Sequence, residues 1–290
     1  MPITSLPTTP TPAQVSPYAF SVYLYGDPKT GKSTWAAQNP KTLFLATEQG
    51  LSGLATMNIP IACWQDLLDA LALLTQQGNK LHETYTAVAI DTVDIAWDLC
   101  TEHIINRWNA TNNKQISHPS DIDYGKVYGL IKDEFRAFIT KMNNLPCQLI
   151  LVGHCKFRDK TRTTPARYVP SMPAAAEDIV CGMVDMILFV EARREGSVLH
   201  TQSSVSFRAG GRAGGMPPQL PMDYHAYMSA LHQALKASAG APVPPPVNND
   251  QTPEQLDEPL SEDKSESVGG LEAKLEETRA KHGGSGTDPF

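Results

Sequence analysis

Short apolar runs alternate with longer amphipathic stretches from Tyr18 onward. The short runs are rich in β-branched and aromatic residues, which favours strands at 20–26, 42–47, 87–91, 148–154 and 186–192. The longer stretches repeat apolar residues at helical spacing, which predicts helices at 31–38, 64–76, 93–108, 124–143, 174–183 and 223–237. Strands separated by helices are typical of an α/β protein, with a mostly parallel sheet flanked by helices.

Composition changes at both ends of this pattern. Residues 1–17 contain five prolines among threonines and small residues, which predicts a disordered leader. Residues 239–290 are Pro-rich and then acidic, which predicts a linker and a disordered tail. Residues 18–238 are therefore expected to form the folded core. Within that core, 197–202 and 204–209 read as two late antiparallel strands.

The net charge of -7 is unevenly placed along the chain. Eleven acidic and four basic residues lie from Gly240 onward, so the rest of the chain is neutral overall and can carry a local basic surface. The five cysteines are widely spaced, without a CxxC pair, as in reduced intracellular proteins. The sequence also shows neither a signal peptide nor an apolar run of membrane-spanning length, so a cytoplasmic location and no membrane partner are expected.

The stretch "GDPKTGKST" matches the pattern G-x-x-x-x-G-K-[ST] between a predicted strand and a predicted helix. Such a loop turns its backbone N–H groups toward phosphates, while its lysine reaches the β- and γ-phosphates and its serine binds Mg²⁺. The cofactors expected are therefore ATP and Mg²⁺. The residues expected to bind them are Gly26, Asp27, Pro28, Lys29, Thr30, Gly31, Lys32, Ser33 and Thr34.

Three further polar residues follow predicted strands and are candidates for catalysis. Asp91 ends "AVAID" and is expected to join Ser33 at the metal; the alternative is a helix cap, for which Asp94 qualifies equally. Glu48 could orient or deprotonate the attacking water, or be a solvated loop residue. His154 could hydrogen-bond a phosphate, or be a structural histidine.

The segment 156–167 has the highest density of positive charge in the predicted core. Basic residues with interspersed aromatics suit single-stranded DNA, because cations contact phosphates and rings stack on bases. A solvated charged loop and the lid of a nucleotide kinase are the alternatives. The residues assigned to DNA are Lys156, Phe157, Arg158, Lys160, Arg162 and Arg167.

The order of these motifs resembles that of the phage RecA-like ATP-binding proteins, the Sak-type single-strand annealing recombinases. It comprises "GDPKTGKST", "FLATEQGL", "AVAIDTVD", "YGKVYGLIKDEF", "LILVGHCK", the basic segment and "VDMILFV", and covers roughly residues 18–236. The resemblance implies a RecA-like P-loop NTPase core that hydrolyses ATP slowly with stimulation by DNA. It also implies annealing or recombination of single-stranded DNA, a single-strand binding protein as partner, and the host cytoplasm as location.

The same resemblance suggests roles for residues outside the P-loop. Lys32, Glu48, Asp91 and His154 take the family's catalytic roles, with His154 as the γ-phosphate sensor that leads into a DNA-binding loop. In "SFRAGGRAGG", Arg208 and Arg212 resemble basic residues that reach a neighbouring subunit's γ-phosphate, which implies a ring or filament. Incidental arginines in a Gly-rich loop are the alternative.

Two further segments carry weaker signals. Residues 107–123 could add a second DNA contact, and the tail ending in Asp288, Pro289 and Phe290 could keep DNA away from the basic segment. The rival functions are an ATP-binding assembly module with negligible hydrolysis and a P-loop small-molecule or nucleotide kinase.

Overall fold

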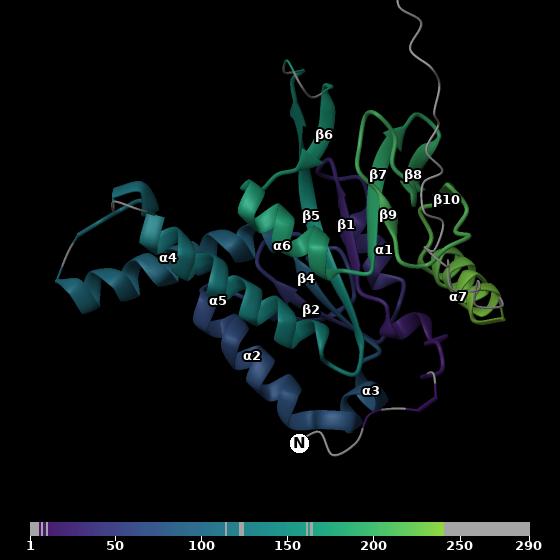
Figure 1. The fold of residues 1–290 in the computed structure, drawn as a ribbon, viewed down its shortest axis with the longest axis horizontal. Coiled ribbons are helices and arrows are strands. Elements are labelled where there is room, and N and C mark those ends of the chain that lie inside the picture. The colour runs from purple at the N-terminus through teal and green to yellow at the C-terminus, as the bar shows by residue number, and fades with distance from the viewer. Residues whose placement is uncertain are drawn as a thin grey trace, which may run out of the picture. The chain divides into compact units, whose positions relative to one another are not determined.

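The computed structural model describes residues 6, 8–9, 11–113, 115–121, 125–160, 162 and 165–240. Residues 241–290, which include most of the predicted linker and tail, and Lys114, within the second candidate DNA contact at 107–123, lie outside the described residues. Within the described part, a ten-stranded sheet is flanked by helices (Figure 1). The strands are β1 (Val22–Gly26), β2 (Thr42–Ala46), β3 (Met57–Pro60), β4 (Ala87–Asp91), β5 (Gln148–Arg158), β6 (Arg167–Pro170), β7 (Met186–Arg193), β8 (Gly196–His200), β9 (Gly210–Gly211) and β10 (Gln219–Pro221).

The sheet is mostly parallel, and its strand order places the ends of three strands together. Its main path runs β10-β8-β7-β1-β5-β4-β2-β3, in which β7 through β3 are parallel and β8 and β10 are antiparallel. β9 pairs with β7 and β6 pairs with β5, both antiparallel. β5 therefore lies between β1 and β4, whose carboxyl ends stand on either side of it.

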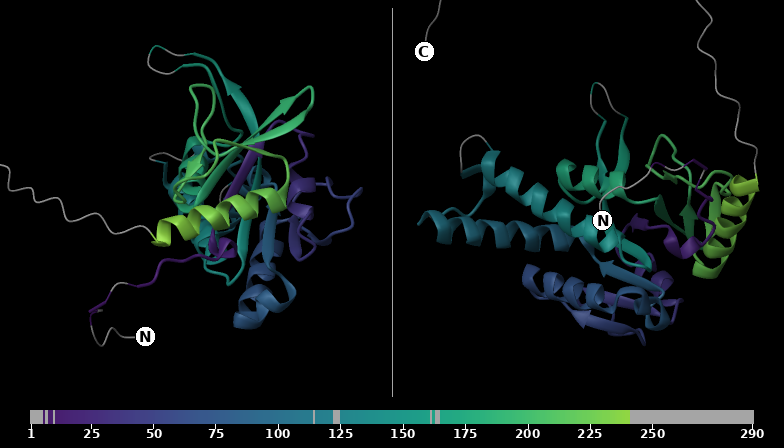
Figure 2. Two further views of the ribbon diagram at one scale, coloured as in Figure 1. Left: turned by 90° about the vertical axis from the view of Figure 1, so that its right-hand side faces the viewer. Right: turned by 60° about the horizontal axis from the view of Figure 1, so that its bottom comes forward.

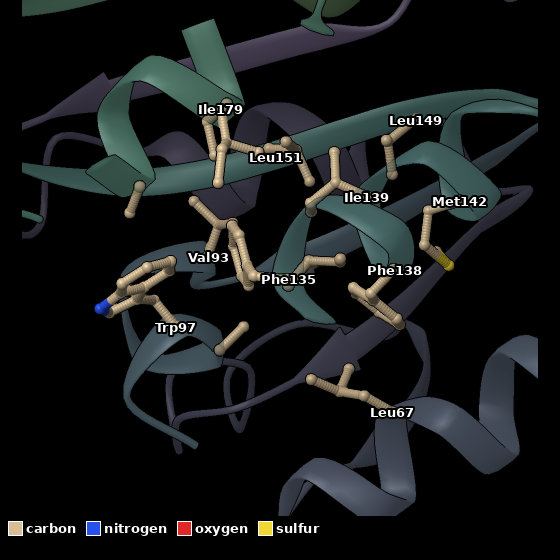
Figure 3. Close-up of a cluster of buried hydrophobic side chains, with 14 of the residues drawn as sticks. Leu67, Val93, Trp97, Phe135, Phe138, Ile139, Met142, Leu149, Leu151 and Ile179 are labelled. Carbon is tan, nitrogen blue, oxygen red and sulfur yellow. The ribbon is translucent and has the colours of Figure 1, made fainter. Parts of the chain in front are cut away.

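Helices cover both faces of the sheet (Figure 2). The helices are α1 (Lys32–Ala37), α2 (Trp64–Gln77), α3 (Leu81–Thr84), α4 (Val93–Asn112), α5 (Lys126–Asn143), α6 (Ala174–Met183) and α7 (Tyr224–Gly240), with 3-10 turns at Pro17–Ala19, Gly78–Lys80 and Pro119–Asp121. One core cluster joins the sheet to α2, α4, α5 and α6, and a second joins it to α1 and α7. The first cluster is built around Phe135, Phe138 and Trp97 (Figure 3).

The two-sided core follows from strand periodicity. In β1, Tyr23 and Tyr25 belong to the cluster under α4–α6, whereas Val22 and Leu24 belong to the cluster under α7. Successive side chains of a strand point to opposite faces, so a strand covered on both sides reads as a continuous apolar run. This confirms the predicted α/β fold class with its mostly parallel, helix-flanked sheet.

Most predicted elements occur close to their predicted bounds, with one clear error. The predicted strand at 204–209 is wrong, because this segment contributes only an isolated bridge between Phe207 and Tyr168. The Ser203 hydroxyl accepts from the amide of Ala209 at 2.9 Å and donates to its carbonyl, and the amide of Ser204 donates to the carbonyl of Phe207. These local bonds occupy backbone groups that a strand ladder would need.

Candidate nucleotide-binding site and basic hairpin

The P-loop connects β1 to α1, as its sequence pattern predicts. Gly26 lies against β7, where an added Cβ would stand 2.6 Å from the carbonyl oxygen of Val190, so only glycine fits there. Gly31 has a φ of 91° and Lys29 a φ of 63°, both in the left-handed region. The hydroxyl of Thr30 donates to the carbonyl of Asp27 across the loop. These features give Lys29 and Thr30 a role in shaping the turn.

The lysine of the P-loop is held against the loop's own backbone. Its Nζ donates to the carbonyl oxygens of Gly26 at 3.0 Å and Asp27 at 2.7 Å, and Lys32 is 5% exposed. Burial lowers the pKa of Lys32, and the nearby carboxylate of Asp91 opposes that shift. The thiol of Cys155, from β5, donates to the Asp27 side chain at 3.1 Å, which ties the loop to the neighbouring strand.

A cavity of about 630 Å³ opens beside this loop. It brings together four of the six predicted catalytic residues, because Lys32, Glu48, Asp91 and His154 all line it. The P-loop residues that line it are Pro28, Lys29, Gly31, Lys32, Ser33 and Thr34. Gln49, Gly53, Leu54 and Thr92 also contribute and were missed from the sequence, where only their proximity to Glu48 and Asp91 could have indicated them.

Strand register explains this convergence. Gly26 of β1 stands opposite His154 of β5, and Asp91 of β4 stands opposite Val152 of the same strand. The carboxyl ends of these parallel strands therefore meet at one edge of the sheet, which is where α/β proteins bind ligands. The hydroxyl of Thr47, which follows β2, accepts from the amide of Thr92 at 2.7 Å and donates to its carbonyl.

Asp91 presents a buried carboxylate at the nucleotide cavity. It is 1% exposed, and neither carboxylate oxygen has a hydrogen-bond partner among the described residues. Burial raises the pKa of Asp91, while the Ser33 hydroxyl, which lies nearby without good hydrogen-bond geometry, and the Lys32 ammonium oppose this shift. Mg²⁺ prefers oxygen ligands and retains several waters, so one carboxylate, one hydroxyl and open space fit it.

His154 is paired with the residue that the sequence offered as a helix cap. Its Nδ1 lies 2.8 Å from an Asp94 oxygen, in the first turn of α4. This hydrogen bond raises the pKa of His154 against the opposing effect of burial. Glu48 is half-buried and lines the same cavity. The cavity thus combines an ammonium, an unpartnered carboxylate, a second carboxylate and an oriented imidazole.

The basic segment is a β-hairpin rather than a loop throughout. β5 continues past His154 to Arg158 and pairs with β6, and this arm extends from the sheet (Figure 1). Lys156, Phe157 and Arg158 lie on one strand and Arg167 on the other, and all the described basic residues of the arm lie outside the core. Phe157 is 56% exposed and stacks edge-on with Tyr168 at 5.3 Å between ring centroids.

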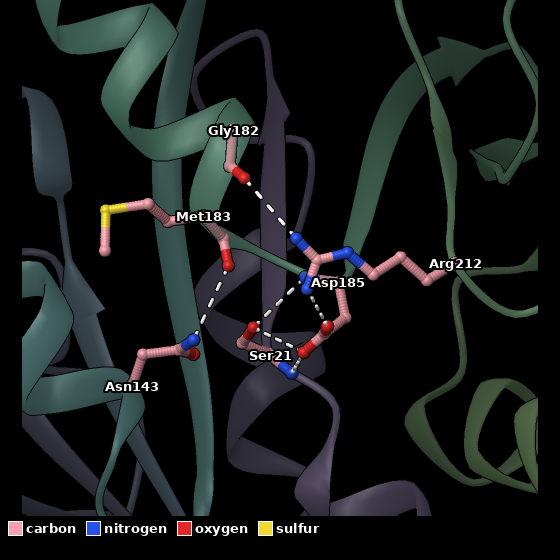
Figure 4. Close-up of polar contacts among 6 residues, drawn as sticks. All are labelled: Ser21, Asn143, Gly182, Met183, Asp185 and Arg212. Atoms are coloured by element: carbon pink, nitrogen blue, oxygen red, sulfur yellow. Dashed lines mark hydrogen bonds and ion pairs between the residues drawn. The ribbon is translucent and has the colours of Figure 1, made fainter. Parts of the chain in front are cut away.

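Neither arginine of the Gly-rich segment lines the nucleotide cavity. Arg212 Nη1 donates to Asp185 at 2.8 Å, and the same carboxylate accepts two hydrogen bonds from Ser21 (Figure 4). Ser21 and Asp185 precede β1 and β7, so this cluster lies at the amino edge of the sheet, opposite the P-loop. Arg208 Nη1 lies 3.9 Å from Glu177 of α6.

The second candidate DNA contact, at residues 107–123, begins on helix α4 rather than on a hairpin. Arg107 lies 3.7 Å from Glu134 of α5, and Trp108 packs partly buried against the core.

All five cysteines are free thiols. Among the described residues, none of the helices has the length and hydrophobicity needed to span a membrane.

Comparison with known proteins agrees with this geometry. The AAA domain family model matches residues 19–213. The uncharacterised protein YorG, derived from the SPbeta prophage of Bacillus subtilis (strain 168), is 24% identical over 148 residues. That alignment covers 50% of this chain and 43% of YorG, so the matched region spans less than half of the relative's length.

Solved structures also match, among them that of a recombinase. The crystal structure of the RadB recombinase matches with a TM-score of 0.38 and 12% identity, over 69% of this chain and 86% of that one. The family match covers the P-loop, Asp91, His154 and the basic hairpin, and it spans well over half of the chain. The chain is a P-loop, nucleotide-binding protein that belongs to the AAA domain family.

Proposed function

We propose that this protein is an ATP- and Mg²⁺-dependent ATPase that binds single-stranded DNA and promotes annealing or homologous recombination. One observation carries this proposal. β5 runs without interruption from the nucleotide cavity, which His154 lines, into the basic hairpin, where Arg158 follows four residues later. A strand shared by both places can transmit the state of one to the other.

Five residues of the cavity have a task in this proposal. Lys32 exchanges the carbonyls of Gly26 and Asp27 for phosphate oxygens, and Ser33 and Asp91 hold Mg²⁺. The bound ion supplies positive charge against the phosphates. Glu48 orients the attacking water, and His154 donates a hydrogen bond to the terminal phosphate while Asp94 fixes its ring.

The hairpin binds DNA by charge and stacking. Lys156, Arg158, Lys160, Arg162 and Arg167 contact backbone phosphates, and the exposed ring of Phe157 stacks on a base. A ring or filament, a single-strand binding partner and the host cytoplasm stay predictions, as do the cross-subunit roles of Arg208 and Arg212.

The direct test measures binding of a labelled single-stranded oligonucleotide across a salt series, with and without ATP and Mg²⁺. Replacing Arg158, Lys160 and Arg162 with alanine removes three phosphate contacts, so the slope of log affinity against log salt should fall by about 2. Replacing Lys132, Arg136 and Lys141, exposed on α5, removes the same charge elsewhere and is the control. Equal effects of the two triple variants would contradict the DNA assignment.

Activity is tested in parallel. Phosphate release should rise when single-stranded DNA is added and should be lost in Lys32→Ala. Annealing is measured with complementary labelled strands. If neither the wild type nor Glu48→Gln hydrolyses ATP measurably, and DNA binding persists in Glu48→Gln, the protein is instead an assembly module.

A kinase is the second candidate, and one observation favours it. A neighbouring cavity of about 720 Å³ shares Glu48, Gln49 and Leu54 with the nucleotide cavity. A carboxylate between two cavities could deprotonate a phosphoryl acceptor bound in the second one. The two candidates differ in the fate of the γ-phosphate, so labelled ATP that yields only inorganic phosphate excludes the kinase.

A further inference from the structure

Glu177 is an acidic residue buried between two arginines from different parts of the chain. It lies in the first turn of α6 and is 7% exposed. One carboxylate oxygen stands 3.9 Å from Arg158 of the hairpin, and the other stands 3.9 Å from Arg208. Both distances exceed those of a hydrogen bond, so each contact is a loose ion pair.

Positive charge is concentrated on the hairpin beside this acid. Arg158 stands directly opposite Arg167 in the register of β5 and β6. Like charges opposite each other on a strand pair destabilise it, and Glu177 supplies a compensating charge. An oxyanion bound at the same place would supply that charge equally well.

The backbone around Arg208 is fixed in position. The Tyr25 hydroxyl donates to the Arg208 carbonyl at 2.6 Å and accepts from its amide at 3.1 Å. The amide of Tyr168, on β6, donates to the carbonyl of Ser206 at 2.7 Å. The segment that carries Arg208 is therefore held beside the hairpin, and nearly half of each arginine side chain is exposed to solvent.

We propose that Arg158 and Arg208 together form one binding site for a backbone phosphodiester of single-stranded DNA, and that the Glu177 carboxylate occupies this site in the free protein. The inference rests on the proposed DNA-binding function and deepens it. Glu177 is held on a helix beyond hydrogen-bond distance from both guanidinium groups, whereas a phosphate on a flexible strand is free to approach them. This assignment replaces the cross-subunit role predicted for Arg208 from the sequence, because Arg208 here serves DNA on its own subunit.

The site also contacts the strand that enters the P-loop. Tyr25 immediately precedes Gly26, and its hydroxyl holds the backbone of Arg208. A phosphate bound by the Arg208 guanidinium is linked to Tyr25 through the backbone of Arg208. This link to the P-loop strand is additional to the one through β5.

The test compares Glu177→Gln with Asp178→Asn, an equal charge change at the adjacent exposed position of the same helix. Affinity for a labelled oligo-dT strand is measured without nucleotide. We expect Glu177→Gln to bind about fivefold more tightly than Asp178→Asn, because only the first removes the competing carboxylate. Arg208→Gln should weaken binding and, combined with Glu177→Gln, should abolish that gain.

The outcomes separate this inference from the proposed function. If the wild-type protein binds oligo-dT and the two charge variants bind it equally, the phosphate site is wrong while the DNA function stands. If Arg208→Gln lowers ATP hydrolysis and leaves DNA affinity unchanged, Arg208 serves a nucleotide and the site is again wrong. If neither wild type nor Glu177→Gln binds DNA at low salt, both proposals fail.

Folding does not limit this test. Thermal unfolding of each variant shows whether it is native. Should Glu177→Gln fail to fold, Glu177→Asp keeps the charge but withdraws it from both arginines, and it should tighten binding in the same direction. Equal affinity of Glu177→Asp and the wild-type protein would overturn the site.

Discussion

The imidazole of His154 and the carboxylate of Asp94 are joined by a contact of 2.8 Å at the edge of the nucleotide cavity. The two residues come from β5 and α4, and the hydrogen bond raises the pKa of His154. Because Asp94 fixes the ring, the other nitrogen of His154 points in a defined direction. Because Asp94 also changes the pKa of His154, a substitution of Asp94 should alter how the stability of the protein depends on pH.

Asp94→Asn should lower the pKa of His154, because burial then acts without the compensating carboxylate. A raised folded pKa stabilises the protein below the unfolded value of about 6.5, and this stabilisation is lost as pH rises through the folded pKa. The stability difference between wild type and Asp94→Asn should thus be largest near pH 5 to 6 and shrink toward pH 9. NMR titration of His154 and urea unfolding measure both effects.

Asp98→Asn is the control for that prediction, since Asp98 lies one turn further along α4 and is exposed. It should leave the titration of His154 nearly unchanged. A His154 pKa that is the same in wild type and Asp94→Asn would show that the pair has no influence on protonation.

Asp91→Asn should stabilise the ligand-free protein while abolishing Mg²⁺-dependent nucleotide binding. The ionised carboxylate is buried without a hydrogen-bond partner among the described residues, so burial disfavours the charged form and raises the pKa of Asp91. Removing that charge should increase the free energy of unfolding by about 1 to 3 kcal/mol near neutral pH. Urea unfolding measures the gain, and calorimetry with nucleotide and Mg²⁺ measures the loss. A destabilised variant would mean that the carboxylate is compensated in the free protein.

Gly26→Ala should destabilise the protein even without nucleotide. The added methyl group would stand 2.6 Å from the backbone oxygen of Val190 and 3.0 Å from its Cβ, so β1 and β7 must separate. Overpacking of this kind costs about 1 to 3 kcal/mol.

Gly129→Ala, on the exposed surface of α5, has open space around the added atom and serves as the comparison. It should stabilise the protein by about 0.5 to 1 kcal/mol, because alanine favours the helix. Thermal unfolding distinguishes the two signs. Equal stability of both variants would contradict the packing role of Gly26.

The sequence was sufficient to predict how Asp91 and His154 come to lie beside the P-loop. Each follows a buried apolar run, and parallel strands place their carboxyl ends at one edge, so no knowledge of side-chain contacts was needed. The boundaries of β4 and α6 could also be predicted, since clear breaks in the apolar pattern flank both elements.

Contacts between distant segments could not be predicted in the same way. Glu177 lies 19 residues from Arg158 and 31 from Arg208, and nothing local in its helix distinguishes it from Asp178. The extension of β5 into the hairpin was missed because charged residues interrupt the apolar run, although backbone pairing with β6 sustains the strand. The prediction of a strand at 204–209 was wrong because serine hydroxyls in and next to this segment bind the local backbone.

Asp185 and Arg212 give the last prediction, because they make unequal contributions to one cluster. Asp185 accepts from the Ser21 amide at 2.9 Å, from the Ser21 hydroxyl at 2.8 Å and from Arg212, and Ser21 is 3% exposed. Asp185→Ala leaves a buried amide without its partner and should cost about 1 to 3 kcal/mol. Arg212, whose side chain is 62% exposed, should cost less than about 1 kcal/mol when replaced by alanine. Urea unfolding ranks the two variants by stability, and a reversed order would contradict this account.

ATP hydrolysis measured on the same samples tests the cross-subunit role of Arg212. If Arg212→Ala keeps native stability and nucleotide binding but loses ATP hydrolysis, Arg212 acts on a neighbour's nucleotide. If ATP hydrolysis is unchanged, its ion pair with Asp185 is its whole contribution.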